Sequence, residues 1–136
     1  MSTSGYGKTF HRAALLPLPL LVSLAGCGTP AASPVKAEVA CAREKEWLRY
    51  RCAVTLTNRQ SGKPVERANV VLTADMPSML LVHSVPPVSA APGATPSVYQ
   101  GVIQLEMVGR WVIAVRVTGP VTDAFTHDLD ATTLPR

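Results

Sequence analysis

Three methionines and one histidine are the side chains of this chain best suited to chemistry. Met76 and Met79 stand on either side of Pro77, His83 follows soon after them, and Met107 lies further along the chain. Thioethers are soft ligands that suit Cu(I), and imidazole binds copper in either oxidation state. We expect the turn at Pro77 to point both sulfurs one way, and on an alternating strand His83 shares the face of Met79. These four side chains form a candidate metal site for copper.

Two other interpretations of the same methionines stay open. Methionine is flexible and adapts to irregular gaps, so all three side chains could simply fill the core beneath a turn. A methionine-rich surface could instead dock a partner protein without any metal. The residue types alone do not choose among copper binding, core packing and docking.

The chain carries no residue set that predicts an enzyme. It lacks the nucleophile elbow, the zinc-protease helix motif and the glycine-rich loops that hold phosphates or dinucleotides. Beyond the first 26 residues its histidines are His83 and His127, and no carboxylates are paired at helical or strand spacing. We therefore predict a non-catalytic protein, with no catalytic residues and no cofactor other than the possible copper.

The start of the chain predicts export and attachment to a bacterial membrane. Three basic side chains, Lys8, His11 and Arg12, precede an apolar stretch over 13–25 that is too short to span a bilayer. The stretch ends in LAGC at 24–27, which is similar to the lipobox, in which the cysteine thiol receives a diacylglycerol and the chain is cut before it. A plain secretory signal is the alternative.

These features predict three parts in the chain. We expect a lipoprotein signal peptide over 1–26, a lipidated Cys27 with a flexible tether over 27–36, and one folded domain over 37–136 that faces the periplasm or the cell exterior. The length of 136 residues suits a single domain, and 47% hydrophobic residues are too many for a disordered chain. Removal of 1–26 leaves 11 basic against 9 acidic residues, so a nucleic-acid partner is not expected.

Cys41 and Cys52 remain as a pair once Cys27 is assigned to lipid. In an oxidising compartment such a pair favours a disulfide. A hairpin that turns around 46–47 would place Cys41 opposite Cys52 and Val39 opposite Val54, within reach of a covalent bond. A redox or metal-binding pair and reduced core cysteines are the alternatives.

Alternating apolar residues predict an all-β domain, an immunoglobulin-like antiparallel β-sandwich of six to seven strands. Four prolines within 84–97 predict an extended loop there. The strands are expected around 39–41 and over 48–57, 69–74, 80–83, 99–106, 111–118 and 124–129.

Several short motifs, taken in order, resemble the YtkA-like domain, a group related to the FixH proteins. The motifs are GKPV at 62–65, ANVVL at 68–72, MPSM at 76–79, Tyr99, and LEMVGRW at 105–111. The resemblance covers roughly residues 50–119 and implies an immunoglobulin-like sandwich that is exported or membrane-attached. It also implies a context of copper handling and respiratory-oxidase assembly. A metal-free module that docks a protein partner in envelope or respiratory-complex assembly, through a sheet face or the proline-rich segment, is the alternative function.

Overall fold

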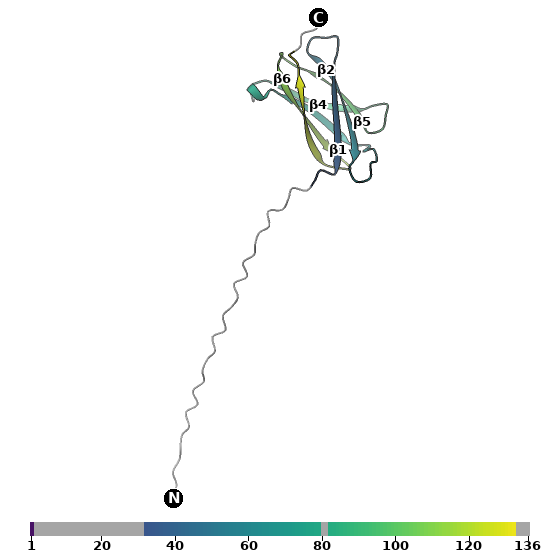
Figure 1. Cartoon of the computed structure of the whole chain (residues 1–136), viewed down its shortest axis with the longest axis vertical. Helices are drawn as coiled ribbons and strands as arrows, with labels where there is room; N and C mark the ends of the chain where they lie inside the picture. Colours follow the sequence, from purple (N-terminus) through teal and green to yellow (C-terminus); the bar gives the residue numbers. More distant parts are fainter. Residues whose placement is uncertain (2–31, 80–81, 133–136) are drawn as a thin grey trace. The chain divides into compact units, whose positions relative to one another are not determined.

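Seven antiparallel strands and one short 3₁₀ helix account for most of the residues that the structure, a computed structural model, describes (Figure 1). The described residues are Met1, 32–79 and 82–132, so the predicted signal peptide and Cys27 lie outside them. The elements are β1 (Val35–Arg43), β2 (Arg49–Asn58), β3 (Asn69–Asp75), η1 (Pro77–Met79), β4 (Ser84–Pro92), β5 (Val98–Gln104), β6 (Arg110–Thr118) and β7 (Asp123–Asp130). Within these residues, no helix is long and apolar enough to cross a membrane.

The strands lie in the order β1-β2-β5-β4-β3-β6-β7, and the sheet that they form folds over into two layers. One layer contains β1, β2 and β5, and the other contains β4, β3, β6 and β7. The end of β4 joins them, because Ala91 and Pro92 pair with β5 while the rest of the strand pairs with β3. At the outer edges, Ser33 just before β1 hydrogen-bonds to Asp123 at the start of β7. The predicted all-β sandwich is confirmed.

The core lies between the two layers and is built by the alternation that the sequence shows. Along β2 and β6 every second side chain is buried, and Trp111 is the largest of the fully buried ones. Each such strand places one apolar face inward and leaves polar residues outside. The inward residues of the central strands include Tyr50, Cys52, Val54, Leu56, Val70, Leu72, Tyr99, Ile103, Trp111, Ile113, Val115 and Val117.

A disulfide joins Cys41 of β1 to Cys52 of β2, as predicted. The strand register also pairs Val39 with Val54, so the expected alignment of the hairpin is confirmed. Cys52 is fully buried, whereas Cys41 is only partly buried because β1 is an edge strand. The bond therefore fastens the edge of the sandwich to its core.

Strand β4 shows that the interpretation of 84–97 as an extended loop was wrong for 84–92, whereas 93–97 do connect β4 to β5 as a loop. The pairing of β4 with β3 shifts register opposite Thr73, so Pro86 and Pro87 lie in a bulge. On its other edge β4 pairs with β5 only through its last two residues. Proline cannot donate to a ladder, but a bulge and an unpaired edge do not require a donor. The chain can therefore continue as a strand through its prolines.

One expected strand and the start of the domain also differ from the expectation. The strand expected over 80–83 is not found in its described part, because Val82 and His83 lie in a turn before β4, while 80 and 81 lie outside the described residues. Strand β1 begins at Val35, two residues before the expected start of the domain.

Candidate functional site

Three connections meet at one end of the sandwich, which we call the loop end: residues 44–48, the described part of 76–83 (76–79 and 82–83), and 105–109. The first and third are joined where the Leu105 N–H donates to the Leu48 carbonyl at 2.9 Å. The second and third are joined where His83 Nδ1 lies 2.8 Å from Glu106 Oε2. All four candidate metal ligands come from the second and third connections. The antiparallel order of the strands therefore brings together residues that are distant in sequence.

Met76 is part of the core. Its side chain is 3% exposed and packs against Gly109 in the turn before β6. A Cβ at Gly109 would lie only 2.8 Å from Met76 Cε, and the φ of Gly109 is +150°, so both space and backbone favour glycine there. The thioether of Met76 is thus covered by the turn that carries Met107.

Met79 is at the surface, although it is close to Met76 in sequence. It ends η1, its N–H donates to the Met76 carbonyl at 3.0 Å, and its side chain is 36% exposed. The turn at Pro77 thus places Met76 in the core and Met79 at the surface. The expectation that this turn points both sulfurs one way was wrong.

His83 lies directly before β4 and contacts Glu106. The side chain of His83 is 28% exposed and that of Glu106 is 55% exposed. Met107 follows Glu106 and packs partly buried against the core, and its carbonyl accepts a hydrogen bond from Trp111 Nε1 at 3.2 Å. The contact with Glu106 therefore brings the imidazole of His83 to the turn that contains Met107. Sequence reasoning missed Glu106, because the contact joins two irregular segments.

The donor set at the loop end fits a soft cation better than a hard one. Within 32–79 and 82–132 no group of three or more His, Cys, Asp or Glu side chains is placed to hold a metal ion. The donor types that the loop end does offer are the thioethers of Met79 and Met107 and the imidazole of His83, which are types that suit Cu(I). His127 lies in the middle of β7 opposite Ile113, so it belongs to a different part of the sandwich.

The basic cluster of the β1–β2 hairpin is largely paired within the protein. Arg49 lies 2.8 Å from both Glu44 and Glu46, and Arg51 lies 2.5 Å from Glu44. The hydrogen bond from Arg51 holds the pKa of Glu44 below its usual value. The guanidinium of Arg43 lies 5.6 Å from the ring centre of Trp47. The hairpin is therefore an ordered part of the loop end.

Large apolar side chains are exposed at the loop end. Trp47 is 53% exposed in the first connection, Val82 71% in the second and Val108 41% in the third. Met79 lies among the same connections. Exposed apolar residues mark a binding surface when they form one contiguous patch. In the sequence, these apolar residues could have been recognised as exposed because they lie between the alternating strands and not within them.

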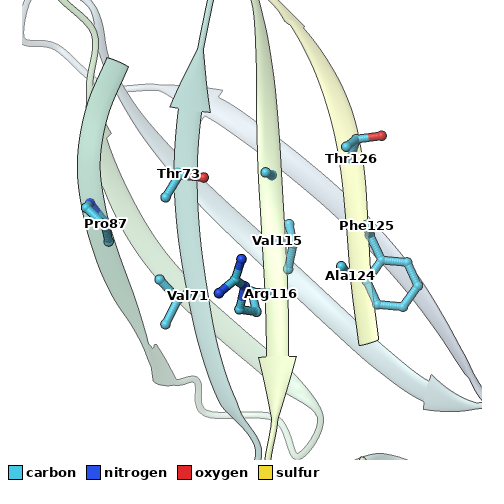
Figure 2. A pocket seen from close by; sticks show the side chains of 9 residues that line it. Val71, Thr73, Pro87, Val115, Arg116, Ala124, Phe125 and Thr126 are labelled. Atoms are coloured by element: carbon cyan, nitrogen blue, oxygen red, sulfur yellow. The ribbon is translucent and has the colours of Figure 1, made fainter. Parts of the chain in front are cut away.

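An open groove of about 490 Å³ lies over β3, β6 and β7 (Figure 2). Its floor contains small side chains, including Val71, Thr73 and Ala114, and the side chain of Arg116 lies towards Val71. A separate groove of about 490 Å³ lies beside η1, where Val112 and Asp128 line it. Neither groove was predicted from the sequence, because small residues on the outer face give no pattern that distinguishes them from an ordinary solvated surface.

Comparison with known proteins gives one match. No curated protein and no solved structure matches the chain. The family model described as YtkA-like matches residues 34–116, which is more than half of the chain and includes Met76, Met79, His83 and Met107. The chain therefore belongs to the YtkA-like family.

Proposed function

We propose that this protein is an exported, lipid-anchored and non-catalytic binding domain that binds or delivers copper at its loop end. The ligands are the thioethers of Met79 and Met107 and the imidazole of His83, and Met76 supports them from the core. The observation that carries the proposal is the contact of His83 with Glu106, because it brings the imidazole to the turn that holds Met107. Met79 adds an exposed thioether on the neighbouring connection.

The disulfide and the chain start support the location. A disulfide between Cys41 and Cys52 is typical of an oxidising compartment outside the cytoplasm. The start of β1 pairs with the end of β2, so it lies at the opposite end of the sandwich from the hairpin at 44–48. Attachment through Cys27 would leave the loop end accessible to a metal donor or acceptor.

A second candidate function is a metal-free module that docks a protein in envelope or respiratory-complex assembly. Two observations favour it: the exposed Trp47, Val82 and Val108 at the loop end, and the groove over β3, β6 and β7. The same surface could also guide a copper-transfer partner to the site.

A Cu(I) titration separates the two functions. The domain from residue 28 onward is suitable, because its core lies within the described part of 32–132. It is titrated in competition with a chromophoric Cu(I) chelator, and we expect one copper per chain. Met79→Leu and Met107→Leu each keep an apolar side chain of similar size while removing a sulfur, so each should weaken binding about tenfold or more. If the wild-type domain takes no copper from the chelator, the copper function is rejected and the docking function is left.

A further inference from the structure

The contact between His83 and Glu106 determines which nitrogen of the imidazole carries hydrogen. His83 Nδ1 lies 2.8 Å from Glu106 Oε2, a normal hydrogen-bond distance. An ionised carboxylate can only accept hydrogen bonds, so Nδ1 must be the donor. In a neutral imidazole only one nitrogen carries hydrogen, and the lone pair is then left on Nε2.

We infer that Glu106 is a positioning residue that holds His83 in the Nδ1–H tautomer and presents Nε2 as its metal-binding atom. The role of Nε2 as a metal-binding atom rests on the proposed copper function, whereas the tautomer of His83 is a property of the metal-free protein. Carboxylates that accept from the second nitrogen of a ligating histidine fix the ring and strengthen the ligand in many metal sites.

The position of Glu106 suits this role. It directly precedes Met107, so one turn supplies both a thioether and the acceptor that orients the imidazole. Its partner comes from the connection that carries Met79, 23 residues earlier in the chain. This hydrogen bond therefore joins the two segments that hold the proposed ligands, beside the packing of Met76 against Gly109.

The contact is too exposed to be explained by stability. Both side chains are reached by water, and exposed ion pairs of this kind contribute little to folding. Removal of the carboxylate should therefore leave the thermal unfolding midpoint within about 3 °C of the wild type. An effect on the tautomer and on copper affinity without an effect on folding is what a positioning role predicts.

The first measurement is the ¹⁵N spectrum of the histidine rings in the metal-free domain at pH 8. For His83 we expect a protonated Nδ1 and a bare Nε2, and His127 serves as a reference in the same spectrum. Glu106→Leu removes the acceptor and should abolish this preference, whereas Glu106→Gln, whose amide can accept from Nδ1–H or donate to a bare Nδ1, should keep it only in part. If His83 of the wild type carries its hydrogen on Nε2, or if Glu106→Leu leaves the tautomer unchanged, the inference is overturned whatever the copper results are.

The second measurement is the Cu(I) competition titration of the same variants. Glu106→Leu should weaken copper binding about tenfold, and Glu106→Gln less than that. Glu66→Leu, which removes an exposed carboxylate between β2 and β3, is the matched control and should bind as the wild type does. A changed tautomer with unchanged affinity would overturn the metal role of Glu106 while the copper function stands. A wild-type domain that binds no copper but shows the expected tautomer would instead overturn the copper function and the metal role that depends on it.

Discussion

The disulfide between Cys41 and Cys52 should contribute a large share of the stability of this small sandwich. We consider the double variant Cys41→Val/Cys52→Val, which keeps apolar side chains of similar size and removes only the cross-link. The two cysteines are 11 residues apart in sequence. In the chain-entropy relation, a loop of this length restricts the unfolded chain by about 9 cal/mol/K, or about 2.8 kcal/mol at 25 °C. For a domain of about 100 residues this corresponds to a fall in the melting temperature of about 12 °C.

Denaturant unfolding of the wild type and the variant, followed by the fluorescence of the buried Trp111, measures this loss directly. Reduction of the wild-type disulfide with a phosphine should reproduce it, because both treatments remove the same constraint. A loss below about 1 kcal/mol by both routes would refute the reasoning, since the hairpin would then be held closed in the unfolded chain without the bond.

Three further predictions concern the core and the hairpin. Met76→Ala should lower the free energy of unfolding by about 2–4 kcal/mol in denaturant titrations. Met76→Leu should change it by less than about 1.5 kcal/mol and should bind copper within twofold of the wild-type affinity. If Met76→Leu loses copper binding, the sulfur of Met76 is a ligand. Gly101→Val should cost about 1–3 kcal/mol, because a Cβ there would lie 2.8 Å from Leu72 Cδ1, and Leu72→Ala in the same chain should recover part of that cost. Because the hydrogen bond from Arg51 lowers the pKa of Glu44 in the folded protein, the stabilisation from this pair is complete above the usual value of 4.5 and is lost as the pH falls through the lower folded value. The difference in melting temperature between the wild type and Glu44→Gln should accordingly shrink below pH 4.5, and a difference that stays constant down to the lowest pH would contradict the pairing.

Period-two alternation was sufficient to predict the strands that have one buried and one exposed face. Trp111, Ile113 and Val115 occupy alternate positions of a strand that also carries Arg116 and Thr118 on its other face, and the structure buries all three. The Cys41–Cys52 register followed from the same alternation, because a shift by one residue would have turned an apolar strand face to solvent. In these strands the local pattern and the tertiary packing agree.

The predictions failed where local composition and tertiary pairing disagree. Pro86 and Pro87 argue against a strand, yet the register shift beside Thr73 gives them positions that need no N–H donor. The different burial of Met76 and Met79 depends on the path of a single 3₁₀ turn, which no periodicity describes. The strand at the two prolines and the burial of Met76 both depend on contacts with residues from other parts of the chain.

The arrangement of the candidate site residues was not predictable from the sequence. The residue types led us to predict Met76, Met79, His83 and Met107 as soft-metal ligands, and their metal binding stays a prediction. The role of Glu106 depends on a contact between two turns, and sequence spacing does not determine which turns meet at the end of a sandwich. Only the strand order shows that these two connections share one end.

The copper K-edge X-ray absorption spectrum of the Cu(I)-loaded domain tests the central claim most directly. The account predicts a ligand shell with thioether sulfur and one imidazole nitrogen, retained in Cys41→Val/Cys52→Val, where no thiol can supply the sulfur. Met79→Leu/Met107→Leu should lose the sulfur signal. A shell of nitrogen and oxygen ligands alone in the wild type, or a sulfur signal that disappears with the cysteines and survives without the methionines, would contradict the account.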